Sequence, residues 1–181
     1  MARISVVGVS GAGKTTLAAR VGRTFGVAHL ELDAVYHQAD WTPLPDDDFR
    51  ARVRVFLDEH EHWVICGNYS MVQDLVWEAA TDVVVLDPPR RRVMRRLGRR
   101  TLGRTLGRTE LWNGNREPWS NLWSRDPERS ILAWAWTQHR EYRERYRAAA
   151  EDPAWEHLRF WFVRSRADEA GVVDRLAVAG R

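Results

Sequence analysis

The sequence predicts an α/β fold in which a parallel sheet of about five strands lies between layers of helices. Three observations favour it. Short apolar runs alternate with longer stretches that suit helices, the first run leads directly into a glycine-rich turn, and 181 residues suffice for one core. Strands that alternate with helices form parallel βαβ units. We therefore expect a single domain over residues 1–181.

The expected strands are apolar runs at 4–7, 28–32, 63–66, 82–86 and 158–163. The helices expected between and after them lie at 13–24, 46–60, 71–79, 90–109, 126–150 and 167–178. Asp46 to Asp48 suit the first turn of the second helix, because a helix N-terminus attracts negative charge. In the helix at 126–150, the helical period puts one set of side chains on a shared face: Ile131, Ala135, His139, Tyr142 and Tyr146.

Composition limits the classes of protein that the chain can belong to. Lys and Arg number 28 against 25 Asp and Glu, a formal net charge of +3. The single cysteine, Cys66, excludes a disulfide framework and favours a reducing compartment. No stretch is long and apolar enough to span a membrane, and the N-terminal run is too short for a signal peptide. These features predict a soluble, cytoplasmic protein without a membrane partner.

Residues 8–16, GVSGAGKTT, match the phosphate-binding pattern G-x-x-x-x-G-K-[ST]. Glycines here let successive backbone N–H groups point at phosphate oxygens, and the following helix adds its positive N-terminus. Lys14, the only lysine, stands where the β- and γ-phosphates need a compact charge, and the Thr15 hydroxyl suits Mg²⁺. The expected nucleotide-binding residues are Gly8, Ser10, Gly11, Ala12, Gly13, Lys14, Thr15 and Thr16. The pattern predicts a three-layer P-loop nucleoside-triphosphate-hydrolase fold.

Among P-loop proteins, the sequence favours a small kinase. A GTPase needs the guanine-reading motif N-K-x-D, which a chain with one lysine cannot also supply. Motor and transporter ATPases need far longer chains. A small kinase needs an acceptor site near the carboxyl ends of the strands and a cationic lid over the transferred group.

The chain resembles the adenylate-kinase-like P-loop kinases, and more closely the bacterial family named for DNA topology modulation. Besides the P-loop, the segments that carry this resemblance are HLELDAVYH at 29–37 with Trp41, WVICGNYS at 63–70, VVVLDPPRRRVMRRLGRR at 83–100, ELWNGNRE at 110–117 and SRD at 124–126. The resemblance covers nearly the whole chain. It implies a five-stranded parallel sheet, ATP and Mg²⁺ as cofactors, and a moving Arg-rich helical lid at about 90–147.

Two acidic residues lie at the end of the second strand. Asp33 follows that strand at the expected mouth of the acceptor pocket, where a carboxylate can orient an attacking hydroxyl or accept its proton. Glu31-Leu-Asp33 is similar to the D-x-D of small-molecule kinases such as shikimate kinase, which implies that Glu31 helps to hold Mg²⁺ through water. The alternative is that both acids cap the segment that follows.

The segment after the third strand supplies further acceptor candidates. Asn68 can donate and accept hydrogen bonds and Tyr69 offers a stacking face, although simple turn chemistry would also suit both. The related kinases commonly carry an aspartate that supports Mg²⁺ at the position of Cys66. A thiol is a poor Mg²⁺ ligand, so metal support must come from Thr15 with Glu31 or Asp33.

An arginine-rich arm runs from 90 to 108, with Arg96 and Arg100 spaced i, i+4 on one helix face. This spacing resembles the lid arginines of adenylate kinases, which implies a catalytic role beside Lys14 and Asp33. Arg125 and Arg140 resemble the second lid pair, with Arg140 catalytic and Arg125 near the acceptor. A solvated basic face is the alternative. Of the tryptophans crowded between 112 and 136, most are expected to pack, and Trp112 is the best candidate for contact with the acceptor.

The sequence therefore favours an enzyme that moves the γ-phosphoryl group of ATP to a small acceptor. A nucleoside monophosphate is slightly preferred, because a charged acceptor would account for the arginines, and a non-nucleotide hydroxyl compound follows closely. A nucleotide-gated DNA-binding protein or a regulatory P-loop ATPase stays an alternative. Nucleic acid is the disfavoured partner, since no base-reading module is visible and the charge is modest. Nothing in the sequence specifies an oligomeric state.

Overall fold

The computed structural model describes residues 2–107, 110–116 and 130–179, and its centre is a sheet of five parallel strands. The strands are β1 (Arg3–Gly8), β2 (Ala28–Glu31), β3 (Trp63–Cys66), β4 (Asp82–Leu86) and β5 (Arg159–Val163). They are arranged in the order β2-β3-β1-β4-β5. The five predicted strands are thereby confirmed, and β1 lies in the middle, with the P-loop at its carboxyl end.

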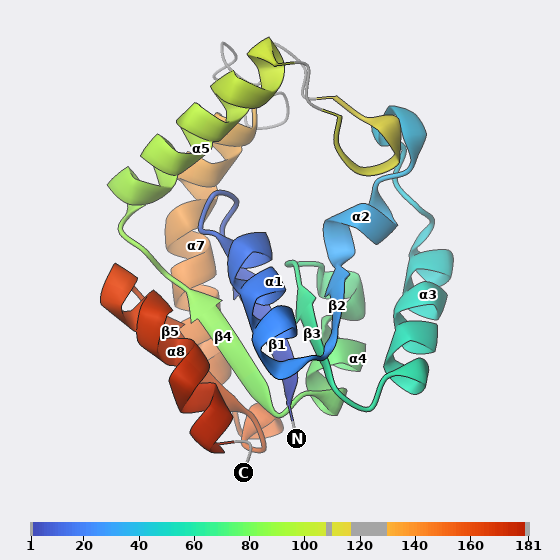
Figure 1. Cartoon of the computed structure of the whole chain (residues 1–181), viewed down its shortest axis with the longest axis vertical. Helices are drawn as coiled ribbons and strands as arrows, with labels where there is room; N and C mark the ends of the chain where they lie inside the picture. The colour runs from blue at the N-terminus through green and yellow to red at the C-terminus, as the bar shows by residue number, and fades with distance from the viewer. Residues whose placement is uncertain (1, 108–109, 117–129, 180–181) are drawn as a thin grey trace.

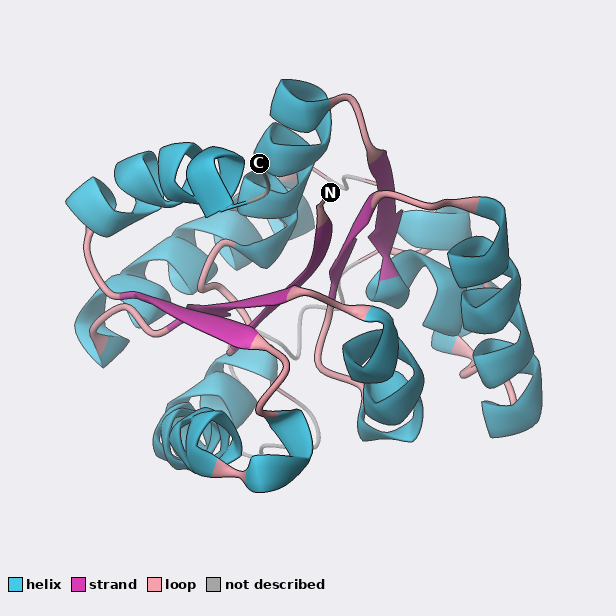
Figure 2. Cartoon of the chain, turned by 90° about the horizontal axis from the view of Figure 1, so that it is seen from below, coloured by secondary structure: helices cyan, strands magenta, loops and turns pink. Residues whose placement is uncertain are grey.

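Helices cover both faces of this sheet (Figure 2). They are α1 (Lys14–Phe25), α2 (Leu32–Tyr36), α3 (Asp46–Glu59), α4 (Ser70–Ala79), α5 (Arg90–Leu106), α7 (Ile131–Glu151) and α8 (Arg166–Ala179). Short 3-10 turns lie at η1 (Ala39–Trp41), η2 (Trp112–Gly114) and η3 (Pro153–Trp155). The predicted three-layer arrangement is confirmed.

Each face of the sheet has its own core. One joins β1 and β4 to α1, α5 and α8 through side chains such as Leu17, Leu97 and Val172. The other joins the opposite face to α3, α4 and α7 through Phe49 and Trp77, among others. Since apolar side chains alternate between the faces of a strand, a sheet covered on both sides needs the nearly continuous apolar runs of β1, β3 and β4.

The structure differs from the sequence-based expectations at two places. Residues 32–36 form the short helix α2, whereas the sequence predicted that the strand continues to Leu32. Leu32 is 3% exposed and lies so close to Gly67 that a Cβ at residue 67 would be 2.7 Å from the Leu32 Cβ. The described part of the last long helix begins at Ile131, and the Ser130 hydroxyl accepts a hydrogen bond from the Ala133 N–H there (3.4 Å).

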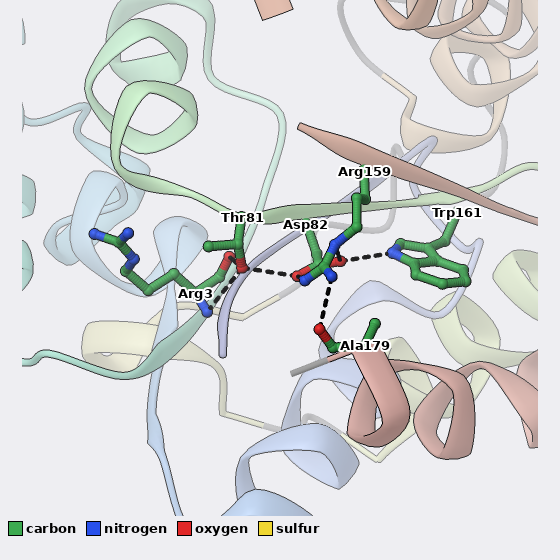
Figure 3. Close-up of polar contacts among 6 residues, drawn as sticks. All are labelled: Arg3, Thr81, Asp82, Arg159, Trp161 and Ala179. Atoms are coloured by element: carbon green, nitrogen blue, oxygen red, sulfur yellow. Dashed lines mark hydrogen bonds and ion pairs between the residues drawn. The ribbon is translucent and has the colours of Figure 1, made fainter. Parts of the chain in front are cut away.

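A buried carboxylate joins several elements at the amino ends of the strands, at the end of the sheet away from the P-loop (Figure 3). Asp82 begins β4 with a side chain that is 4% exposed, and Arg159 of β5 donates to both its oxygens at 2.9 Å. Trp161 and Thr81 add hydrogen bonds to the same carboxylate at 2.8 and 2.7 Å. Arg159 also donates to the Ala179 carbonyl (2.7 Å), so this cluster ties the end of α8 to the sheet.

Two long helices carry the chain beyond the carboxyl ends of the strands. Helices α5 and α7 run side by side past the P-loop, and residues 110–116 reach across to α2 and η1 (Figure 1). We call 110–116 the lid tip. Of the face predicted on α7, Ala135, His139 and Tyr146 are buried. None of the described helices is long and apolar enough to cross a membrane.

Candidate active site

The P-loop between β1 and α1 adopts a conformation that its glycines make possible. Gly8 and Gly11 have φ of 142° and 81°, in a region that side chains rarely adopt. A Cβ on Gly8 would lie 2.5 Å from the Leu86 carbonyl oxygen, and one on Gly11 would lie 2.9 Å from the Leu97 Cβ. The loop is therefore held tightly between β4 and α5.

The Lys14 ammonium lies against the inner side of this loop. Its Nζ donates to the Gly8 carbonyl at 2.7 Å and to the Val9 carbonyl at 3.4 Å. Burial lowers the pKa of Lys14, and the nearby positive charge of Arg100 acts in the same direction against the raising effect of Asp33. An anionic ligand would relieve this repulsion between cations, as expected at a phosphate site.

Glu31 lies beside Cys66 in the sheet. The two residues are direct partners in the parallel pairing of β2 with β3. The Thr15 hydroxyl donates to Glu31 Oε1 at 2.5 Å, so its oxygen keeps its lone pairs for a cation. These oxygen donors fit Mg²⁺, which keeps several waters and takes further ligands from substrate phosphates. No group of three or more His, Cys, Asp or Glu side chains that could hold a metal ion occurs in the described ranges.

The Cys66 thiol itself is protonated. Burial raises its pKa to about 12, and the negative charge of Glu31 contributes to this rise. Its Sγ lies 3.6 Å from His29 Nε2. A buried neutral thiol fills space beside the metal-supporting residues and is unsuited to bind Mg²⁺.

Asp33, at the start of α2, is oriented by Tyr69 of the 67–69 loop that follows β3. The Tyr69 hydroxyl donates to Asp33 Oδ1 at 2.6 Å and lies 3.4 Å from His37 Nε2. Burial raises the pKa of Tyr69, and the Asp33 charge raises it further, so the phenol stays a proton donor.

Asn68 lines the same cavity, but its amide holds the P-loop. Its Oδ1 accepts from the Gly8 N–H at 3.0 Å, and its Nδ2 donates to the Gly8 carbonyl at 2.6 Å. Tyr146 also donates to Oδ1 (3.0 Å). The sequence predicted an acceptor contact for Asn68; these bonds give it a structural role in fixing Gly8.

Helix α5 presents a stripe of three arginines to the cavity: Arg96, Arg100 and Arg104. Arg96 donates to the Ala12 carbonyl (3.1 Å) and pairs with Glu169 of α8 at 3.3 Å. The sequence singled out Arg96 and Arg100, and the same i, i+4 spacing continued once more would have found Arg104. A second stripe on this helix faces solvent: Arg91, Arg95 and Arg99.

Arg140 corrects the sequence-based assignment. It was expected to be catalytic, but its side chain is 84% exposed and pairs with Glu144 one turn along α7 (2.6 Å). It does not line the cavity. On this helix the buried face of His139 and Tyr146 turns inward, so the helical period rotates residue 140 away from the site. Arg125, the other expected member of this pair, lies outside the described residues.

The lid tip is docked on the segment that follows β2. Asn115 Oδ1 accepts from the Trp41 N–H, and its Nδ2 donates to the Gln38 carbonyl, both at 2.8 Å. Trp41 Nε1 donates to the Arg116 carbonyl at 3.0 Å. The tip also brings Trp112 into the site, with its ring 6.2 Å from that of His37 and inclined by 20°. The tip therefore covers the cavity on the side of α2 and η1.

The resulting cavity has a volume of about 1500 Å³ and extends from the P-loop to α2, η1 and the lid tip. It brings together most of the predicted site residues: Ser10, Gly11, Gly13, Lys14, Thr15, Thr16, Glu31, Asp33, Asn68, Tyr69, Arg96, Arg100 and Trp112. Gly8 and Ala12 lie behind this lining and act through their carbonyls. Sequence reasoning missed several lining residues at the end of α2, in η1, on the lid and on α8: His37, Trp41, Arg104, Trp134, Tyr142 and Glu169.

No protein-family model matches the chain, and neither does any curated protein. Solved structures do match. They include a shikimate kinase from Acinetobacter baumannii in complex with shikimate (TM-score 0.53, 18% identity, 100% of this chain and 95% of that chain). A sugar kinase from a Janibacter species has a TM-score of 0.52 at 18% identity, covering 98% and 93% of the two chains. An uncharacterised protein from Eubacterium ventriosum has a TM-score of 0.53 at 11% identity, covering 99% and 98%.

At these identities the likeness shows the fold. The α/β P-loop architecture is confirmed over nearly the whole chain. The resemblance to the family named for DNA topology modulation has no matching family model.

Proposed function

We propose that the protein transfers the γ-phosphoryl group of ATP to a hydroxyl group of a small acceptor. One observation carries this proposal: the Lys14 ammonium and the Asp33 carboxylate line one cavity, with Arg100 on its wall. This arrangement supports a triphosphate site and a base for an acceptor hydroxyl in a common space. The kinases among the solved structures of similar fold support the same class of reaction.

The residues suggest how transfer occurs. Lys14 and Arg100 neutralise the phosphates, and Asp33, held by Tyr69, orients the acceptor hydroxyl and takes its proton. The hydroxyl oxygen forms a bond to the γ-phosphorus while the bond from that phosphorus to the β–γ bridging oxygen breaks, which releases ADP. Mg²⁺, when held by the phosphates with Thr15 and Glu31, would neutralise the charge on the bridging region.

The charge distribution favours an acceptor without a phosphate group. Residues that line the acceptor side from β2, α2, η1 and the 67–69 loop are Glu31, Asp33, His37, Trp41, Asn68 and Tyr69. None of these is a lysine or arginine, whereas the phosphate of a nucleoside monophosphate requires cations. Arg50 of α3 does not line the cavity and forms an ion pair with Asp74 at 2.7 Å. The described residues therefore do not support the slight preference for nucleotides that the sequence suggested; Arg125, its expected acceptor contact, lies outside them.

The aromatic side chains of the same region suit a ring compound. Trp41 and Trp112 contact each other edge to face, with ring centroids 6.4 Å apart, and both line the cavity. Aromatic faces with a few polar groups are typical of small-molecule sites. A polyhydroxylated ring would meet these faces and present a hydroxyl to Asp33. Two of the structural neighbours are a shikimate kinase in complex with shikimate and a sugar kinase. The compounds in these names are hydroxylated rings of this kind.

The test is a transfer screen with γ-labelled ATP across polyols, sugars, cyclic hydroxy acids, nucleosides and nucleoside monophosphates. We expect label to move to a hydroxyl compound without a phosphate group, and Lys14→Ala to abolish transfer. Preferred transfer to a monophosphate would contradict the acceptor class. Hydrolysis of ATP without transfer to any compound, or salt-sensitive binding to duplex DNA in its place, would contradict the proposed function itself.

A further inference from the structure

The carboxylate of Glu31 is bound at both of its oxygens by groups from distant parts of the chain. Its Oε1 accepts from the Thr15 hydroxyl of the P-loop at 2.5 Å. Its Oε2 accepts from the indole Nε1–H of Trp112, in the lid tip, at 3.0 Å. A single side chain thus joins the nucleotide side of the cavity to the lid.

Trp112 is held in this place by the docking of the lid tip rather than by its own helix. Asn113 Nδ2 donates to the Ala34 carbonyl at 3.3 Å, and Asn115 bonds to the backbone of Gln38 and Trp41. Asn113 itself has a φ of 56°, so the turn is tight around Trp112. The indole can therefore reach Glu31 only while the tip is docked.

We propose that Trp112 is a positioning residue for the metal–nucleotide site, through which docking of the lid tip sets the affinity of the P-loop for Mg²⁺. This inference rests on the proposed function. A free glutamate side chain samples several rotamers, and fixing it costs free energy. Because the indole holds Oε2, Oε1 faces Thr15 and accepts a hydrogen bond from its hydroxyl. The lone pairs of that hydroxyl are then directed to the cation.

The coupling works in both directions. If a docked tip raises affinity for the metal–nucleotide complex, that complex must favour the docked tip to the same extent. Groups that orient metal-supporting side chains typically contribute about 10- to 100-fold to metal affinity. Because Trp112 acts through Glu31, its contribution cannot exceed that of Glu31 itself.

The experiment compares Trp112→Phe, which keeps a ring but removes the N–H, with Trp134→Phe, the same change at another tryptophan of the cavity. Binding of a non-hydrolysable ATP analogue is measured by calorimetry over a Mg²⁺ titration and in EDTA. We expect Trp112→Phe to weaken the Mg²⁺ dependence by about tenfold. Binding of the analogue by Trp112→Phe in EDTA should stay within about twofold of the wild type. The Mg²⁺ dependence of Trp134→Phe should resemble that of the wild type.

Two further measurements separate positioning from packing. In a Glu31→Ala background, Trp112→Phe should have no additional effect on Mg²⁺ dependence. Hydrogen exchange of the lid tip should slow with the metal–analogue complex in the wild type and not in Trp112→Phe. An unchanged Mg²⁺ dependence in Trp112→Phe, or an equal loss in Trp134→Phe, would overturn the inference alone. No binding of the analogue by the wild type would overturn the proposed function with it.

Discussion

The pairing of Glu31 with Cys66 across β2 and β3 makes a rescue experiment possible. Glu31→Ala removes the carboxylate that accepts a hydrogen bond from the Thr15 hydroxyl. The same carboxylate is the one expected nearest the cation. We expect Mg²⁺ affinity in the presence of an ATP analogue to fall by about 10- to 100-fold, or about 1.4 to 2.7 kcal/mol. Introducing Cys66→Asp into this variant returns a carboxylate from the neighbouring strand, since the two positions are Cα partners. Much of the lost affinity should then return.

The same Cys66→Asp change should be unfavourable in the wild-type background. Residue 66 is 2% exposed, so a second carboxylate would be buried beside Glu31, and like charges disfavour each other. We expect a loss of unfolding free energy of about 1 to 3 kcal/mol. Calorimetric Mg²⁺ titrations and urea unfolding of the four proteins complete a double-mutant cycle. Wild-type Mg²⁺ dependence in Glu31→Ala, or no recovery in the double variant, would refute the assignment of Glu31.

Further predictions concern the arginines and the thiol. Arg100→Ala should lower kcat by about a thousandfold, as expected for an arginine that stabilises the transferred group, whereas Arg140→Ala should stay within about twofold in steady-state assays. Comparable losses in both would mean that the lid closes differently during turnover. The Cys66 thiol, with its pKa raised to about 12, should react with iodoacetamide at pH 8 roughly a thousandfold more slowly than an ordinary cysteine, and faster as pH rises. Rapid labelling of the folded protein would contradict the burial of this side chain.

The strands and the P-loop could be predicted because local sequence determines them. A largely apolar segment such as 82–86 is stable as a strand in a sheet that is covered on both faces. The glycines of 8–13 permit a loop conformation that few other residues could adopt. The sequence did not predict helix α2 because it extends over only five residues, and Leu32 at its start is buried in close approach to Gly67. That approach is a tertiary contact, which no local pattern contains.

Predicted site residues that follow the ends of strands line the cavity, as do those on α5, whereas Arg140 on α7 does not. Asp33 and Tyr69 follow β2 and β3, and parallel strands bring their carboxyl ends to one edge. Arg140 was assigned by resemblance, although the helical period of α7 already placed it away from the buried face. The bond between Trp112 and Glu31 joins residues 81 apart in the sequence, and depends on how the lid tip docks.

The most direct test of the central claim is Asp33→Asn, which keeps the size of the side chain and removes its charge. Two quantities are compared with the wild type: the affinity for an ATP analogue, and transfer of label from γ-labelled ATP to the best acceptor of the screen. We expect analogue binding to stay within about threefold, while transfer falls by about 10²- to 10⁴-fold because the base is lost. Full transfer by Asp33→Asn would contradict the account, since the carboxylate held by Tyr69 would then have no part in the chemistry.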